Sequence, residues 1–417
     1  MENDKFEEKN MEHKLSEYFN LLLNLNEHWQ VVNITTDFDL KEINIEIKYV
    51  GKEVTYGDDN KRYKIYDHAK QRKWRHLDTM EYKTYILCRL PRIIDGQNKV
   101  KTISPPWASK HDRYTFLFEA QVITLLQITK NQTKTAEFMR CGFRVINSII
   151  HKSCERGLKR RNLQNMSLKH LSIDEKSFKR GHHYVSVLSS PAGGYVIDIE
   201  EGRTKDSAKK LLDKSLTPQQ QSDVETISMD MWDAYMSASK EKLPNAEIVH
   251  DKFHLIKYLN DAIDKVRRRE VKSNQELRNS RWALLKNQCN LTEKQRIKFE
   301  AIRNANYNVS KAWEVRENFK DLFGIEKETR HAFYLFYKWA ANSKNKQIKE
   351  INKVVETFLK HVVGVTNALV SSFNNAMAER LNGKIQEIKT IGRGYRTFNN
   401  FRSAILFFHG GLDLYPQ

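Results

Sequence analysis

The order of apolar segments between residues 171 and 270 constrains the fold more than any other feature of the sequence. Three segments with a strand-like pattern come first: LSIDE, HYVSVLSS and YVIDIE. A helical pattern, TKDSAKKLLDKSL, follows, and then strand and helix patterns alternate as VETISMD, DAYMSASKEK, NAEIVHD and FHLIKYLNDAIDKVRRR. The sequence therefore predicts three consecutive strands, a helix, and two strand–helix repeats.

This order is typical of an RNase H-like α/β domain, so we expect a core built on a mixed five-stranded sheet with flanking helices. Residues 267–360 have a helical pattern and separate the fifth strand from a last helix. We therefore expect an all-helical insertion that interrupts the core. Ahead of the core, residues 50–110 are basic and aromatic with short β-like segments, which predicts a small β-rich module.

Two aspartates lie where the predicted first and fourth strands end, Asp174 and Asp230. In an RNase H-like sheet these strands are neighbours, and open α/β sheets bind ligands at such carboxyl ends. A third carboxylate, Glu379, lies on the last helix in a polar stripe with Asn382, away from an apolar stripe. Carboxylate oxygens suit Mg²⁺, and such a cluster could hold the two ions, roughly 3.5–4 Å apart, that phosphodiester chemistry uses.

Each of these carboxylates also has a structural alternative. Asp230 precedes a helix and could cap it, Asp174 could be a turn residue, and Glu379 could be a solvated helix position. Because neighbours on a strand point to opposite faces, we expect Asp174 rather than the adjacent glutamate to be a ligand. The rivals for single positions are Glu175, Asp198 and Asp233.

A second pattern, HDKFH, follows the predicted fifth strand and contains Asp251 and His254. Asp251 could cap the next helix and accept a hydrogen bond from His254. An acid or base role for His254 is the alternative, but a histidine fixed by a nearby aspartate is more often architectural.

The charge balance favours a polyanionic partner. Lys and Arg number 71 against 52 acidic residues, for a formal net charge of +19. Nucleic acid is the first candidate, since basic side chains neutralise phosphates and release counterions. We find neither a membrane-spanning segment nor a signal pattern, and the 4 cysteines form no CxxC pair, so we expect a soluble intracellular protein with reduced thiols.

Residues 115–160 contain a long helical pattern, a short one and a third one with a basic end, which predicts a helix-turn-helix. Gly142 would make the turn, and residues 143–153 would form the recognition helix. Three helices that pack without contacting DNA are the alternative, as is a solvated charged face for the β-rich module. The candidate DNA-binding residues are Arg72, Lys73, Trp74, Arg75, Arg140, Arg144, Asn147, Lys159, Arg160, Arg161, Arg393 and Arg396.

Four stretches resemble one family, the ISL-three family of DDE transposases of bacterial insertion sequences. They are SIDEKSFKRGHHYVSVL, SMDMWDAY, LPNAEIVHDKFHLIK and NAMAERLNGKIQEIKTIGRGYRTFNNFRSAIL. The resemblance implies that Asp174, Asp230 and Glu379 are an acidic triad that binds two Mg²⁺ ions, with Mn²⁺ tolerated. It also implies that Asp251 and His254 form a DxxH signature and that residues 256–366 are the insertion domain.

One departure from the family concerns zinc. Members carry an N-terminal zinc-binding module with paired cysteines, whereas this chain has EVTYG and RLPRIIDGQ at those places, so we expect no zinc. We expect five segments: residues 1–112 as a β-rich, degenerate zinc-ribbon-like module, 113–165 as the helix-turn-helix, 166–255 and 367–417 as the two parts of the core, and 256–366 as the insertion.

The function expected from these features is that of a DNA transposase. It would bind the terminal inverted repeats of its element as a homodimer or higher oligomer, cut the double-stranded DNA ends and join the 3′-hydroxyls to target DNA, in association with the bacterial nucleoid in the cytoplasm. Two alternatives stay open: another RNase H-like nuclease, and a catalytically silent, domesticated transposase that regulates through DNA binding.

Overall fold

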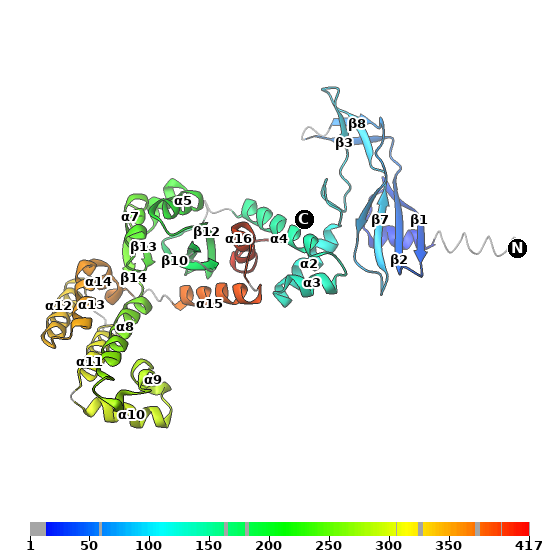
Figure 1. Ribbon diagram of the computed structural model, residues 1–417. Helices are drawn as coiled ribbons and strands as arrows, with labels where there is room; N and C mark the ends of the chain where they lie inside the picture. The colour runs from blue at the N-terminus through cyan, green and yellow to red at the C-terminus, as the bar shows by residue number, and fades with distance from the viewer. Residues whose placement is uncertain are drawn as a thin grey trace, which may run out of the picture. The chain divides into compact units, whose positions relative to one another are not determined.

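The computed structural model describes residues 14–57, 61–161, 166–179, 183–305, 307–323, 328–371, 376–392 and 394–416. Two compact units make up the chain: Met1–Leu158 together with Asp413–Gln417, and Lys159–Leu412. Figure 1 shows the elements of both units. None of the helices in these described ranges is long and apolar enough to cross a membrane.

The first unit contains β-structure, as the sequence predicts, after a helical stretch over residues 14–22. Its main sheet has the order β1-β2-β7-β6, formed by Trp29–Asp37, Glu42–Tyr49, Lys83–Cys88 and Arg72–Arg75. A hairpin joins β3 (Glu53–Tyr56) to β4 (Lys61–Lys64), and a small sheet has the order β5-β8-β9, from Asp67–His68, Pro91–Ile94 and Val100–Thr102. Trp29, Trp74 and Trp107 form the centre of the core in T-shaped contacts.

Three helices complete the first unit: α2 (Phe116–Thr129), α3 (Gln132–Phe138) and α4 (Phe143–Arg160). Thr115 caps α2 and Asn131 caps α3, each by accepting a backbone N–H hydrogen bond. The turn before α4 differs from our expectation in one detail. Arg140 has the left-handed conformation, with φ 49°, whereas Gly142 has no positive φ.

The second unit contains the predicted five-stranded sheet, in the order β12-β11-β10-β13-β14. The strands are β10 (His170–Lys179), β11 (His183–Ser190), β12 (Tyr195–Glu201), β13 (Thr226–Met229) and β14 (Glu247–His250). The first three pair antiparallel, and β10, β13 and β14 run parallel. This mixed order is that of an RNase H-like domain.

Helices cover both faces of this sheet (Figure 1). On one face, α5 (Lys205–Ser215) and α7 (Asp233–Lys242) bury Leu211, Leu212 and Tyr235 in one apolar cluster with Ile173. Another helix, α6 (Pro218–Asp223), follows α5. On the other face, α16 (Phe398–His409) stacks Phe401 on Phe178 of β10, and α15 (Ala376–Ile391) runs beside the same strand. Odd and even positions of β10 therefore face different helices.

The first strand is longer than the sequence pattern indicates. We expected it to end at the acidic pair, but β10 continues through Lys179 and pairs with β11 over that length. Its pairing with β13 is short and ends at Ser172, which lies opposite Ser228. Residues 174–177 of β10 are polar and partly exposed because they leave the buried centre of the sheet while staying in the hairpin.

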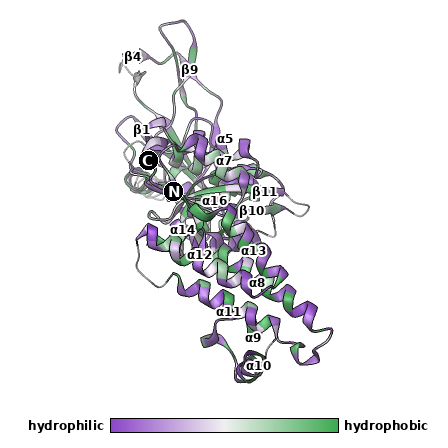
Figure 2. Cartoon of the chain, turned by 90° about the vertical axis from the view of Figure 1, so that its left-hand side faces the viewer, coloured by the Kyte–Doolittle hydropathy of each residue, from purple (hydrophilic) through white to green (hydrophobic). Residues whose placement is uncertain are grey.

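The described elements between β14 and α15, where we expect the insertion, are all helices. The insertion starts within α8 (Lys252–Glu270) and continues through α9 (Arg281–Leu285), α10 (Glu293–Asn304), α11 (Asn308–Asp321), α12 (Thr329–Asn345), α13 (Lys349–Lys360) and α14 (Val362–Val370). Figure 2 shows hydrophobic and hydrophilic residues side by side along these helices. Their apolar sides, including Phe319, Phe336 and Phe358, form one core, and α14 lies against β14.

A glycine permits this close approach of α14 to the sheet. A Cβ atom at Gly364 would lie 2.5 Å from Cδ2 of His250, which is buried on β14. We expect Gly364→Ala to lower the free energy of unfolding by about 1–3 kcal/mol, the usual cost of overpacking. Gly383→Ala is the matched control, because a Cβ there meets nothing within 4 Å and should be neutral or stabilising. Urea denaturation of the two variants tests this, and equal stability would contradict the packing.

The same histidine should make stability depend on pH. Burial lowers the pKa of His250 to about 4, well below its value in an unfolded chain. The neutral ring therefore contributes stability that is complete above about pH 6.5 and is lost as the pH falls toward about 4, by up to about 3 kcal/mol. We expect His250→Gln to weaken this dependence. Urea denaturation near pH 7 and near pH 4.5 measures it, and parallel losses in both proteins would contradict it.

Candidate active site

The sheet brings the two predicted aspartates to the same level. Ser172 and Ser228 are paired across β10 and β13, and Asp174 and Asp230 each follow two residues later. Both carboxylates are therefore at the end where these parallel strands separate, which is the usual ligand-binding edge of such a sheet. Both are partly exposed, with 17% and 32% of the respective side chains accessible.

Asp174 has three polar neighbours. Its Oδ2 atom accepts a hydrogen bond of 2.6 Å from Nδ2 of Asn382 on α15, and Nζ of Lys176 lies 3.0 Å from the same oxygen. Its Oδ1 atom accepts a hydrogen bond from the backbone N–H of Glu175. Asn382 belongs to the polar stripe predicted from the sequence. Sequence reasoning missed Lys176, although its spacing of two residues from Asp174 on a strand places both on one face.

Asp230 is held by a histidine rather than by a helix cap. Its Oδ2 atom lies 3.3 Å from Nδ1 of His254. Burial alone would raise the pKa of Asp230, but the hydrogen bond and charge of His254 lower it below the ordinary value. Burial likewise opposes the charge on His254, yet Asp230 raises the pKa of that imidazole. The two groups thus form a charge-assisted pair at the site.

The sequence suggested Asp251 as one partner for His254. The structure places His254 against Asp230. Asp251 does cap α8, as expected, since its Oδ1 atom accepts from the backbone N–H of Phe253. Met229 and His250 are paired across β13 and β14, so Asp230 comes level with Asp251 and within reach of the first turn of α8.

The third predicted carboxylate, Glu379, lies on α15, three residues before Asn382. Its side chain lies outside the described residues. One helical turn separates these positions, so the backbone of Glu379 is on the side of α15 that carries Asn382 to Asp174. The apolar stripe predicted for this helix is buried at Leu381, Ile385 and Ile388.

The structure also places the rival aspartates. The N-cap of α7 is Trp232, so Asp230 is not the cap of that helix. Asp198 is buried and paired with Arg402, with 2.7 Å between Oδ1 and Nε. Asp233 is exposed in the first turn of α7. Asp174 is a strand residue rather than a turn residue.

The remaining rival, Glu175, points away from Asp174. Its carboxylate lies 3.1 Å from the guanidinium of Arg203. The charge of Glu175 is thus compensated on the opposite face, consistent with the alternation expected along β10.

The donors at this edge suit a hard divalent cation. Asp174 and Asp230 offer carboxylate oxygens, which Mg²⁺ prefers, and both remain partly accessible. In the described part of the chain, which omits the Glu379 side chain, no group of three or more His, Cys, Asp or Glu residues is arranged to hold a metal ion. Two carboxylates with a third on α15 therefore form the candidate metal set.

Comparison with known proteins places this site within a family. The model of the ISL3 DDE domain, described as "Transposase", matches residues 171–405, more than half of the chain and all of the elements that carry the site. The chain belongs to the ISL3 (ISL-three) family of transposases. A second family model, described as the zinc-finger of transposases IS204, IS1001, IS1096 and IS1165, matches residues 58–94.

Two curated relatives of this ISL3 transposase are transposases themselves. The transposase for insertion sequence element IS1001 of Bordetella parapertussis is 25% identical over 70% of this chain and 72% of its own length. The transposase for element IS1557 of Mycobacterium tuberculosis (strain CDC 1551 / Oshkosh) is 24% identical over 78% of this chain and 79% of its own. Among solved structures, the Mos1 strand transfer complex matches 54% of this chain and 78% of its own at 14% identity, with a TM-score of 0.16.

The zinc-finger family match argues against our expectation that the protein binds no zinc. The donors in this part of the ISL3 transposase are few, however. Cys88 is the only cysteine between residues 58 and 94. Burial raises the pKa of its thiol to about 12, and His76 contacts Thr115, with 3.0 Å between Nδ1 and Oγ1. A structural zinc ion takes four nitrogen or sulfur ligands, so the donors of residues 61–94 do not fit one.

Trp74 is not available to DNA, contrary to our expectation. It has no exposed surface and packs against Trp107 at a centroid distance of 5.8 Å. Alternation along β6 turns this ring into the core while Lys73 stays exposed. We therefore withdraw Trp74 from the DNA-binding set.

Several of the expected DNA-binding arginines stabilise the fold. Arg75 and Arg140 both pair with Asp78, and Arg161 donates to the backbone oxygen of Ile197 at 2.9 Å. Arg72 donates to two backbone oxygens in the same way. Lys73 also has a partner, since its Nζ atom lies 3.0 Å from Oε2 of Glu42. The expected residues that are at least partly accessible and that we keep in the DNA-binding set are Lys73, Arg144, Asn147, Lys159, Arg160 and Arg396; Arg393 lies outside the described residues.

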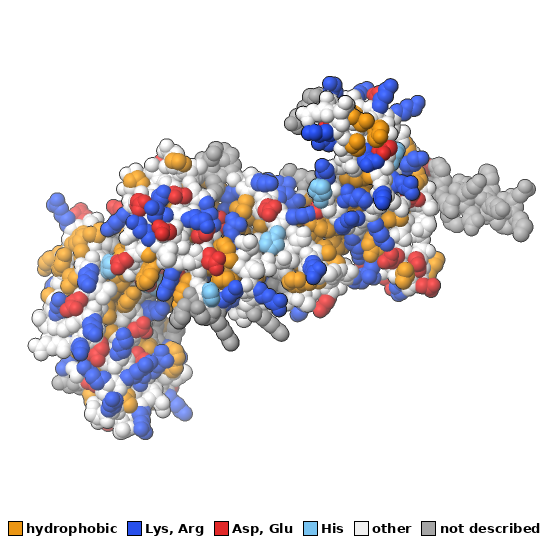
Figure 3. All heavy atoms as spheres, turned by 45° about the horizontal axis from the view of Figure 1, so that its top comes forward, with side chains coloured by type: hydrophobic (Ala, Val, Ile, Leu, Met, Phe, Trp, Pro, Cys, Tyr) orange, Lys and Arg blue, Asp and Glu red, His pale blue; other side chains and the backbone are white. Residues whose placement is uncertain are grey.

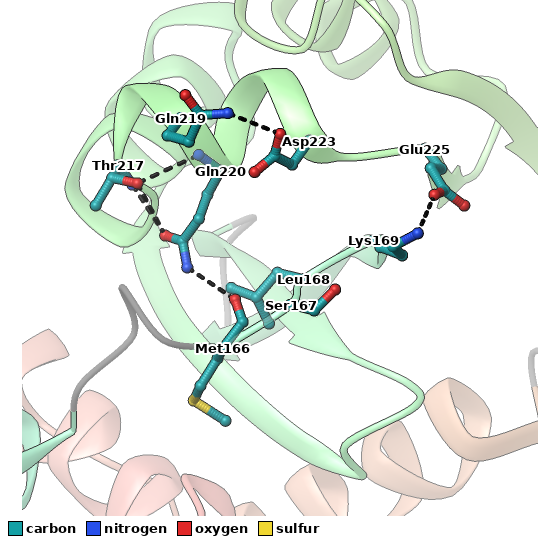
Figure 4. A pocket seen from close by; sticks show the side chains of 9 residues that line it. All are labelled: Met166, Ser167, Leu168, Lys169, Thr217, Gln219, Gln220, Asp223 and Glu225. Carbon is teal, nitrogen blue, oxygen red and sulfur yellow. Dashed lines mark hydrogen bonds and ion pairs between the residues drawn. The ribbon is translucent and has the colours of Figure 1, made fainter.

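Lys and Arg side chains are spread over the face shown in Figure 3 and alternate with acidic ones. A polar pocket lies at the residues that precede β10 (Figure 4), lined among others by Lys169, Gln220 and Glu225. Lys169 pairs with Glu225 there, and Gln220 donates to the backbone oxygen of Met166. This pocket is separate from the candidate active site.

Proposed function

We propose that this protein is a DNA transposase that binds the terminal inverted repeats of its own insertion sequence, cleaves the ends and joins the 3′-hydroxyls to target DNA. The observation that carries the proposal is that Asp174 and Asp230 lie at the same level, where two parallel strands separate. Asn382 of α15 donates a hydrogen bond to Asp174 at this place. Membership of a transposase family supports it.

In this proposal, Asp174, Asp230 and Glu379 would hold two Mg²⁺ ions, and Mn²⁺ could replace them. When bound, these ions would activate a water molecule or a 3′-hydroxyl for attack and would stabilise the leaving oxygen. Asn382 orients the Asp174 carboxylate, and His254 fixes the carboxylate of Asp230. Lys176 balances charge at Asp174, so repulsion between the carboxylates is reduced before an ion binds.

DNA binding is assigned to the first unit and to the basic residues that remain accessible. The exposed side chains of Arg144 and Lys159 on α4 would contact phosphates, which gives affinity that falls with salt. Base contacts from the start of α4 would give specificity for the ends. Paired ends imply a dimer or a larger assembly.

The proposal is tested with purified protein, Mg²⁺ and a labelled duplex that carries one end of the element. We expect a nick at the 3′ end of the element, followed by covalent joining of that end to a second, unlabelled duplex. Cutting without joining would instead favour a different RNase H-like nuclease. Tight binding with no metal-dependent cutting would favour a silent, domesticated regulator. The absence of both binding and cutting would refute the proposal.

A further inference from the structure

An exposed tryptophan lies close in the chain to one of the proposed metal ligands. Trp232 follows Asp230 by two residues and is 41% exposed. It occupies the N-cap of α7 without a side-chain cap hydrogen bond. Serine, threonine, aspartate or asparagine would stabilise that position better, so helix formation does not explain a tryptophan here.

The indole of Trp232 is fixed in one orientation. Its Nε1–H donates to the backbone oxygen of Arg203 at 2.9 Å, and the guanidinium carbon of Arg203 lies 5.0 Å from the ring centroid. The same guanidinium lies 4.1 Å from the ring of Tyr184 and pairs with Glu175. Arg203 is therefore held by two aromatic rings and a carboxylate, and it braces the indole.

The contacts of Arg203 with Glu175 and Trp232 join two residues that lie near the proposed metal ligands in the sequence. Glu175 is adjacent to Asp174 in sequence, and Trp232 lies just beyond Asp230. A braced, partly exposed indole at this place has the properties of a stacking platform for a nucleic acid base, which contributes about 1–3 kcal/mol per base. A base inside a duplex is covered by its neighbours, so only a base that has left its stack can use the platform.

We propose that Trp232 is a positioning residue that stacks on an unstacked base next to the cleaved phosphodiester. Arg203 and Glu175 keep the indole in place for that contact. This inference rests on the proposed function, because it assumes that DNA is cut at Asp174 and Asp230.

The test compares two forms of one element end, both with 2-aminopurine beside the cut: a fully paired duplex and one with unpaired bases at that position. All proteins carry Asp174→Asn, so binding is measured without cleavage. We expect Trp232→Ala to weaken binding of the unpaired form about 5- to 100-fold and to abolish the stacking-dependent quenching of 2-aminopurine. Binding of the paired form should change less than about twofold, and Trp232→Phe should keep most of the quenching.

Trp282→Ala is the matched control, because Trp282 is 55% exposed and also has an arginine over its ring, Arg281 at 5.2 Å, but lies in the insertion. It should behave like the parent protein. Equal weakening of both DNA forms, unchanged quenching in Trp232→Ala, or the same defect in Trp282→Ala would overturn the stacking role. If the parent protein bound neither form more tightly than an unrelated duplex, the proposed function itself would fail, and the inference with it.

Discussion

Replacing Asp174 by asparagine should abolish metal-dependent cleavage of an element end, with a loss of at least about 10³-fold in rate. The substitution removes a charge that a divalent ion requires but keeps the shape of the side chain. The Oδ1 atom of an asparagine can still accept the hydrogen bond that Asn382 donates. The loss should therefore appear in chemistry and metal affinity rather than in folding.

Three measurements separate these effects. Binding of the end by mobility shift should stay within about twofold, while the rise in melting temperature caused by Mg²⁺ should disappear, since a bound ion stabilises only the protein that holds it. Asp233→Asn is the control, because Asp233 is exposed and lies near Asp230 in sequence. It should cleave like the parent protein. Full cleavage by Asp174→Asn would remove Asp174 from the site.

Periodicity predicted the core because the relevant signals are local. The strands β11 and β12 and the helix α5 were predicted correctly, because their apolar residues repeat with a period of two or of about 3.6. The end of β10 was not predicted correctly, because polar residues in a hairpin outside the buried centre resemble a turn in sequence. In the same way, the sequence of β6 is that of a basic, exposed segment, although the alternation of side chains along the strand buries Trp74.

The site was predictable in its residues but not in its contacts. The order of elements placed Asp174 and Asp230 on neighbouring strands, and the polar stripe placed Asn382 on the correct side of α15. Nothing local in the sequence indicates that Asn382 donates to Asp174 or that His254 pairs with Asp230. Those contacts depend on how β13, α8 and α15 approach one another, which is a property of tertiary packing.

The approach of α8 to the site depends on how the insertion is held together. This helix carries His254 in its first turn and continues into the core of the insertion. Arg316 of α11 ties three of the helices there. One of its Nη atoms donates to Oδ1 of Asn260 on α8 at 2.7 Å and to the backbone oxygen of Leu284 on α9 at 2.9 Å.

Arg316→Met should therefore lower the free energy of unfolding by about 3–5 kcal/mol. Only 2% of Arg316 is exposed, so the change leaves the oxygen atoms of Asn260 and Leu284 without this donor, whereas Glu317 keeps its pair with Lys320 at 3.2 Å. Arg303→Met is the matched control, because the Arg303–Glu300 pair is exposed, with 3.8 Å between N and O, and should cost less than about 0.5 kcal/mol. Urea denaturation measures both, and hydrogen exchange should speed up along α8, α9 and α11 but not along β10. A loss below about 1 kcal/mol would show that Arg316 does not hold the insertion together.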